Sequence, residues 1–122
     1  QRGELEAAQA HWQQALRWDP DFAYALNNLA ALRVGGGDLD GAAELYRRSL
    51  ALRPADARVH RILGSLELAR GHAGIAREEL LRALELDPEV ELGRSELERA
   101  RRALEQLEAP REIPGDEVSA PE

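Results

Sequence analysis

One regular period, of about 34 residues, governs most of this 122-residue chain. Pro20, Pro54 and Pro88 follow one another at that interval, and each proline closes a similar run: ALRWDP, SLALRP and ALELDP. Gly37 and Gly71, which lie between these prolines, keep the same interval. A repeat of this length indicates structural units that stack on one another and bury a shared core.

Apolar residues keep helical spacing in both halves of each unit. They are Leu26, Leu29, Leu32 and Leu66 in the first helices and Leu5, Trp12, Leu16, Leu45 and Leu84 in the second helices. We expect Gly37 to turn the chain between two helices, because glycine tolerates the left-handed backbone of a tight helix end. Gly3 has the same phase and is expected to be a turn too. Gly35 and Gly36 have no counterpart in the next unit and loosen the joint.

Small and large residues recur at fixed phases of the repeat. The small ones, expected where two helices approach closely, are Ala30 with Gly64, Ala8 with Ala42 and Ala76, and Ala15 with Ser49 and Ala83. The large ones are Trp12, Tyr46 and Leu80 in one phase and Trp18, Leu52 and Leu86 in another. We expect both large sets to fill gaps between neighbouring units rather than to form a cofactor site.

On these small residues, glycine turns and closing prolines, residues 1–88 resemble the tetratricopeptide repeat (TPR) family. The resemblance implies an all-α solenoid of helix-turn-helix repeats. The slot that is usually Trp holds Leu26 and His60, and the slot that is usually Tyr holds Arg33 and Glu67, so the packing is less aromatic than the family pattern.

The repeat phase divides the chain. We expect a TPR array over residues 1–108 and a tail after it. The array comprises a half repeat at 1–20, full repeats at 21–54 and 55–88, and a capping helix at 89–108. Glu98 stands where a further repeat would need Ala or Gly, so this last helix is interpreted as the polar cap that a solenoid needs.

The first helix, residues 5–18, has no partner helix before it. It would therefore expose Ala8, Trp12 and Ala15. We interpret the sequence as a piece of a longer array, or as a chain whose missing helix comes from another chain.

Residues 109–122, APREIPGDEVSAPE, contain three prolines and carry a net charge of −3, one Arg against four acidic residues. Such a segment cannot bury enough surface to fold, and we expect a disordered acidic tail. The alternative is that this tail is itself a ligand for a groove.

The composition argues against catalysis and against bound cofactors. The chain has no cysteine, and its three histidines, His11, His60 and His72, fall on different elements. We expect structural or solvated roles for all three. No nucleophile motif, phosphate loop, zinc pair or calcium loop is present. The sequence predicts a protein that is not an enzyme and holds no cofactor or metal.

The net charge of −7 opposes binding to nucleic acid or anionic membrane. No run approaches the ~20 apolar residues that span a bilayer, so we expect a soluble chain. The sequence leaves the compartment unknown, with the cytoplasm slightly favoured over the periplasm. All basic residues are arginine, which favours a GC-rich, bacterial source.

In TPR folds the first helices line a concave groove, and the resemblance places three sets of residues there. They are Tyr24, Asn27, Asn28, Ala31 and Val34; Arg58, Arg61, Ile62, Ser65 and Leu68; and Leu92, Ser95, Glu96, Arg99 and Arg102. The predicted partner-binding residues are Tyr24, Asn27, Asn28, Ala31, Arg58, Arg61, Ser65, Arg99 and Arg102.

Asn28 has the phase at which some family members hold a peptide backbone, and NNLA resembles the asparagine-bearing repeats of O-GlcNAc transferase. A carboxamide can both donate to and accept from a peptide unit. Arg58 is similar to a basic position of the co-chaperone clamp for terminal carboxylates, although Ile62 replaces the next basic residue. Alternatively, Arg58 and Arg61 are solvated or paired with Glu67 or Glu96.

The leading hypothesis is a scaffold that binds an extended or acidic peptide of a partner protein. Asn27 and Asn28 would hold its backbone, and Arg58, Arg61 and Arg99 its carboxylates. The second hypothesis is an assembly subunit that makes contacts, including self-association, through its first helix and outer faces. A third is a regulatory or targeting domain of a larger enzyme. RNA binding is a distant fourth, because the charge is negative and aromatics are scarce.

Overall fold

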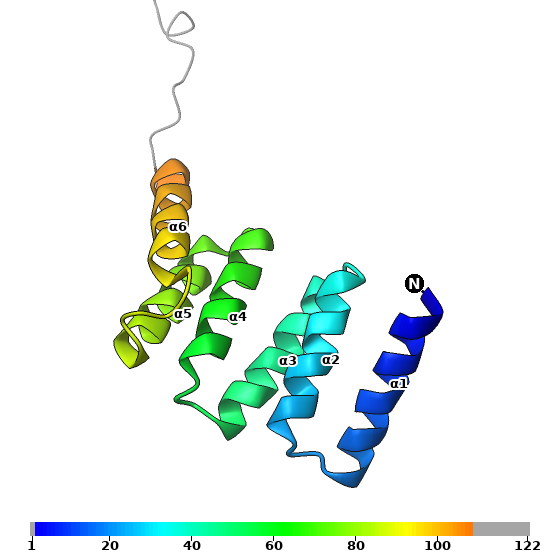
Figure 1. Cartoon of the computed structure of the whole chain (residues 1–122). Coiled ribbons are helices and arrows are strands. Elements are labelled where there is room, and N and C mark those ends of the chain that lie inside the picture. The colour runs from blue at the N-terminus through cyan, green and yellow to red at the C-terminus, as the bar shows by residue number, and fades with distance from the viewer. Residues whose placement is uncertain (1, 109–122) are drawn as a thin grey trace, which may run out of the picture.

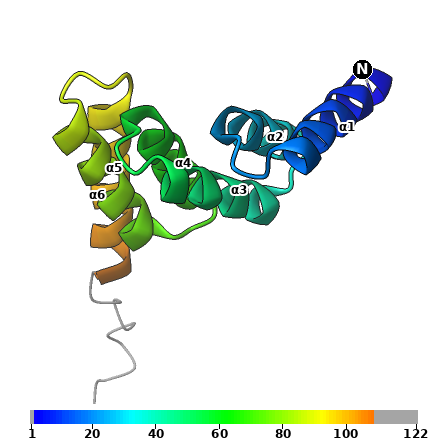
Figure 2. The ribbon, with the colours of Figure 1, turned by 90° about the horizontal axis from the view of Figure 1, so that it is seen from below.

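The computed structural model describes residues 2–108, and every regular element in this range is an α-helix (Figure 1). The helices are α1 Arg2–Trp18, α2 Ala23–Gly35, α3 Leu39–Leu52, α4 Ala57–Ala69, α5 Ala73–Leu86 and α6 Gly93–Glu108. Each helix packs chiefly on its neighbours in the chain, and α1 and α6 lie at opposite ends of the row (Figure 2). The predicted all-α repeat architecture is confirmed. The prediction of a disordered tail at 109–122 lies outside the described residues.

The two glycine turns have the same geometry. Gly37 and Gly71 both have φ +84°, the left-handed conformation that side-chain-bearing residues rarely adopt. At each turn the backbone N–H after the glycine returns to a carbonyl five residues earlier: Asp38 to Arg33 and His72 to Glu67, both at 2.8 Å. The role predicted for Gly37 is confirmed. Gly35 ends α2, and Gly36 caps it with φ −89°.

Gly3 does not turn the chain, contrary to the prediction. It lies inside α1, which begins at Arg2. The ordinary helical conformation continues through Gly3, and no left-handed residue interrupts α1.

Close approach of helices depends on the small residues, as expected. A Cβ atom added at Gly64 would lie 2.7 Å from Cγ of Leu80 and 3.2 Å from the carbonyl oxygen of Ala76. Ala30 and Ala83 are fully buried. Within residues 2–108 the core has two clusters, one among α2, α3 and α4 and one joining α5 to α6.

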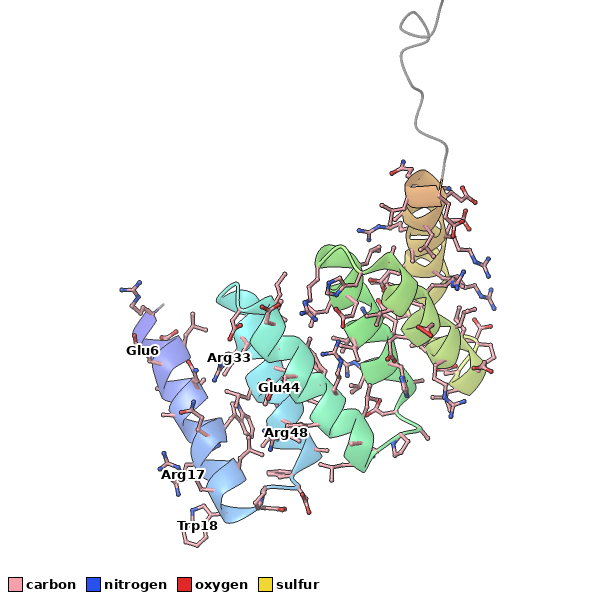
Figure 3. The ribbon with its side chains drawn as sticks, turned by 180° about the vertical axis from the view of Figure 1, so that it is seen from behind. Glu6, Arg17, Trp18, Arg33, Glu44 and Arg48 are labelled. Atoms are coloured by element: carbon pink, nitrogen blue, oxygen red, sulfur yellow. The ribbon has the colours of Figure 1, made fainter. Side chains whose placement is uncertain are left out.

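Of the two predicted sets of large residues, only one fills the core. Tyr46 and Leu80 are buried, and Trp12 packs against the first cluster. The prediction for the other phase is wrong for two residues: Trp18 is 81% exposed and Leu52 40% exposed. These residues end α1 and α3, where the chain leaves the helix and no neighbouring helix covers them. Figure 3 shows Trp18 pointing away from the other helices.

The first helix is covered on one side only. No residue of α1 is buried, but Ala8, Trp12 and Ala15 are half-buried rather than exposed, contrary to expectation. The reason is that α2 already packs against this face, with the Trp12 ring edge-on to the ring of Tyr24 at 5.5 Å. Leu5 and Trp18 are the large apolar residues that α1 exposes.

Candidate functional site: a hollow between the first helices of two repeats

A hollow of about 330 Å³ lies between α2 and α4, the first helices of the two full repeats, with α3 at its floor. Its lining residues are Tyr24, Asn27, Asn28, Ala31, Tyr46, Arg53, Asp56, Arg58, Val59 and Ile62. Five of the nine predicted binding residues are in this list: Tyr24, Asn27, Asn28, Ala31 and Arg58. Arg61 and Ser65 lie farther along α4, and Arg99 and Arg102 lie on α6.

Two adjacent carboxamides on α2 present acceptor oxygens at the hollow. Asn28 donates from Nδ2 to the backbone carbonyl of Tyr24 at 2.7 Å, which orients its side chain against its own helix. Asn27 Oδ1 is buried and has no hydrogen-bond partner in the described part of the chain. A buried carbonyl without a donor costs about 1–3 kcal/mol, so a ligand N–H that reached Asn27 would remove an existing penalty.

Two arginines at the hollow have no carboxylate partner among residues 2–108. They are Arg53, which caps the end of α3, and Arg58 in the first turn of α4. The one carboxylate there, Asp56, caps α4 by accepting from the backbone N–H of Val59 at 3.2 Å. Two guanidiniums against one carboxylate leave the hollow positively charged on a chain whose net charge is −7.

The floor of the hollow is the phenol of Tyr46, which is 4% exposed. Burial raises the pKa of Tyr46 above its ordinary value, and the guanidiniums of Arg61 and Arg58 oppose this effect only in part. Because the phenol stays neutral at physiological pH, its hydroxyl can donate to or accept from a ligand.

Arg61 is paired within the chain. Its Nη1 lies 3.4 Å from Oε1 of Glu96, with the two side chains 18% and 7% exposed. Pairing with Glu96 is one of the alternatives that the sequence leaves open, and this ion pair ties α4 to α6. A ligand carboxylate would have to compete with Glu96 for Arg61. On α6, Arg102 pairs with Glu98 at 3.5 Å, whereas Arg99 is exposed and makes no ion pair with a described residue.

An aromatic row borders the hollow on the α1 side. Tyr24 contacts Trp12 at 5.5 Å between ring centroids and Phe22 at 5.9 Å. Tyr24 is 59% exposed and Phe22 38% exposed. The row therefore offers ring surface to anything that lies in the hollow.

The histidines have structural or solvated positions, as expected. His60 lies between Oε1 of Glu79 at 2.7 Å and the carbonyl oxygen of Pro54 at 2.8 Å. His72 contacts the buried Glu67, and His11 is exposed beside Trp12. Within residues 2–108, no group of three or more acidic or histidine side chains is arranged to hold a metal ion. No helix in this range is long and apolar enough to cross a membrane.

Sequence reasoning missed four lining residues: Tyr46, Arg53, Asp56 and Val59. The repeat phase of Tyr46 predicts a packing role alone, although this residue also lines the hollow. The sequence does distinguish Arg53, because it is a basic residue at a repeat position that is acidic elsewhere. Asp19 and Asp87 occupy that position in the other two runs that end in proline. Asp56 and Val59 form a helix cap whose position beside the groove depends on the tertiary packing.

The row of paired helices, the glycine turns that recur once per repeat and the groove-facing hollow define an α-helical repeat solenoid. Residues 1–66 match the sequence model of the tetratricopeptide repeat family. The chain belongs to this family. No curated protein sequence is similar enough to count as a match.

Solved structures of TPR proteins share the fold. The O-GlcNAc transferase of Thermobaculum terrenum is 34% identical with a TM-score of 0.73 over 80% of this chain, which spans only 19% of that protein. The first TPR of Spaghetti (RPAP3), bound to an HSP90 peptide, is 20% identical with a TM-score of 0.78, covering 84% of this chain and 82% of that one. The Yersinia enterocolitica type III secretion chaperone SycD, in complex with a YopD peptide, is 22% identical with a TM-score of 0.68, covering 88% and 82%.

Proposed function

We propose that this chain is a non-catalytic scaffold that binds an extended, acidic peptide segment of a partner protein in the hollow between α2 and α4. The peptide backbone meets Asn27 and Asn28, and its carboxylates meet Arg53 and Arg58. Arg61 contributes only when a ligand displaces Glu96. Arg99, Arg102 and Ser65 extend the same groove toward α6 for a longer peptide.

One observation carries this proposal: within residues 2–108, Arg53 and Arg58 line the hollow without carboxylate partners, and the Oδ1 of Asn27 beside them has no hydrogen-bond donor. A peptide supplies the two things this site lacks, a backbone N–H and acidic side chains. Two fold neighbours, the RPAP3 domain and SycD, are solved with peptides bound, which supports a peptide as the class of ligand. Their identities of 20% and 22% make this an argument from fold alone.

A binding titration tests the proposal. A fluorescent peptide library with zero to four acidic residues per peptide would be titrated against the whole chain, and against Arg53→Gln/Arg58→Gln. We expect affinity to rise with peptide charge, to weaken as salt increases, and to fall about fivefold or more in the variant, since each exposed pair is worth up to about 1 kcal/mol.

The matched control is Arg48→Gln/Arg101→Gln, which removes two exposed arginines away from the hollow; Figure 3 labels Arg48 on α3. This variant should bind as the unchanged chain does. Equal losses in both double variants, or affinity that ignores peptide charge, would reject the acidic-peptide site.

A second candidate is assembly through α1. Its motivation is that Leu5 and Trp18 are exposed on a helix that is covered on one side only. Sedimentation of the whole chain over a hundredfold concentration range would test it. Self-association that Trp18→Gln abolishes would support assembly, and a concentration-independent monomer mass would reject it.

A further inference from the structure

The hollow and the aromatic row beside it together fit a ligand that carries both negative charges and apolar rings. Arg53 and Arg58 suit carboxylates. The exposed rings of Phe22 and Tyr24 suit an apolar ring, and proline is the residue that packs on exposed aromatic faces while keeping a peptide extended. An ideal occupant is therefore an extended segment in which prolines alternate with acidic residues.

Residues 109–122 of this chain, APREIPGDEVSAPE, have that composition. Pro110, Pro114 and Pro121 are interspersed with four acidic residues, and the net charge is −3, one Arg against four acids. The segment's charge is thus opposite to that of the hollow, and its prolines match the aromatic row.

We propose that residues 109–122 occupy the hollow of their own chain, so that a partner peptide must displace them. This inference rests on the proposed function, because it regulates the same site. Pro121 lies against Phe22 and Tyr24, and the carboxylates of Asp116, Glu117 and Glu122 face Arg53 and Arg58.

The segment is long enough to reach. It starts after Glu108, at the end of α6, whereas the hollow lies toward the starts of α2 and α4. The 16 residues of α6 span about 24 Å, and one or two helix spacings add about 10–20 Å sideways. The 14 residues of the segment extend to about 46 Å, so its second half reaches the hollow.

Tethering makes a weak contact effective. A short flexible linker gives an effective concentration on the order of 1 mM, so a segment with an intrinsic Kd of about 0.1 mM fills the hollow about nine tenths of the time. A partner peptide then binds with an apparent affinity about tenfold weaker than its intrinsic one.

A spin label locates the segment directly. The chain has no cysteine, so Ser119→Cys gives one attachment site for a nitroxide on the full chain. We expect the label to broaden the NMR signals of the Asn27 and Asn28 side-chain amides. Because the contact is within one chain, the broadening should be the same after a tenfold dilution of the protein. Arg53→Gln/Arg58→Gln should abolish the broadening, and Arg48→Gln/Arg101→Gln should keep it.

Absence of broadening would overturn the inference. A mixing experiment gives the other contradictory outcome. If an isotope-labelled chain is broadened only after a separate spin-labelled chain is added, the segment docks between copies and the inference is overturned.

A second titration separates this inference from the proposed function. A synthetic peptide of residues 109–122 would be added to the full chain and to Asp116→Asn/Glu117→Gln/Glu122→Gln, whose own segment has lost three of its four negative charges. We expect about tenfold tighter binding to the variant. Equal binding to both would overturn the inference while leaving the groove a peptide site. No binding of this or any library peptide to either protein would reject the proposed function as well.

Discussion

His72 contacts Oε1 of Glu67 through Nδ1 at 3.1 Å, and one repeat earlier Arg33 donates to Oδ2 of Asp38 at 3.0 Å. These are the same two repeat positions with the acidic and basic residues exchanged. Each pair spans a glycine turn, so both turns are held by a side-chain contact between residues five positions apart, although the acid precedes one turn and follows the other.

Glu67 is the more consequential of these residues because it is fully buried. Besides contacting His72, its carboxylate accepts from Arg47 on α3 and from Nη1 of Arg70 at 2.8 Å. We expect Glu67→Gln to lower the free energy of unfolding by about 2–3 kcal/mol. In the variant, the NH₂ group of the glutamine replaces an accepting oxygen and faces a guanidinium that is itself a donor. Urea denaturation measures this. The control is Asp40→Asn, which loses an exposed contact with Arg70 and should cost less than about 1 kcal/mol.

Gly71→Ala tests the left-handed turn. Alanine at φ +84° is strained although no atom lies within 4 Å of the added Cβ, so we expect a loss of about 1–2 kcal/mol of stability. Gly35→Ala is the matched control, because that residue is helical and its surroundings are equally open. It should be neutral or stabilising by up to about 1 kcal/mol. Thermal unfolding of both variants gives the comparison, and equal effects would contradict the turn geometry.

Gly64→Ala tests the close approach of α4 and α5. The new methyl group would collide with Leu80 and the Ala76 carbonyl, and we expect overpacking to cost about 1–3 kcal/mol. Gly74→Ala, on α5 with nothing within 4 Å of its Cβ, should instead stabilise by roughly 0.5–1 kcal/mol. Chemical denaturation measures both. Opposite signs for the two glycines are the expected result.

Asp38 predicts a dependence of stability on pH. The backbone N–H of Gly41 and, after it, the side chain of Arg33 hold the pKa of Asp38 below its ordinary value. A carboxyl whose folded pKa is depressed stabilises the fold above its unfolded pKa and loses that contribution as pH falls through the folded pKa. The melting temperature of Asp38→Asn should therefore be lower than that of the unchanged chain at pH 6, and the difference should shrink by pH 3. A constant difference would contradict this assignment.

The repeat was readable from the sequence because its determinants are local. Gly37 and Gly71 share the repeat position at which a left-handed residue closes the turn. Ala30 and Gly64 share the position at which two helices touch. Gly3 has the same phase but lies inside α1.

Half of the candidate site followed from the phase of the first helices: Asn27, Asn28 and Arg58 all line the hollow. Arg53 did not follow, because it lies between helices and not on a groove-facing helix. Trp18 has the phase of a packing residue, yet it is exposed where α1 ends.

The period, the helices, the turns and the set of residues that can face the groove follow from the sequence, since each depends on neighbours within one repeat. Packing between helices selects which of those residues are available to a ligand. Arg61 and Arg58 lie one helical turn apart, but Glu96, 35 residues after Arg61, neutralises the first and leaves the second without a described partner. A charge that comes from a different helix has no signature in the local pattern, because packing alone brings the two groups together.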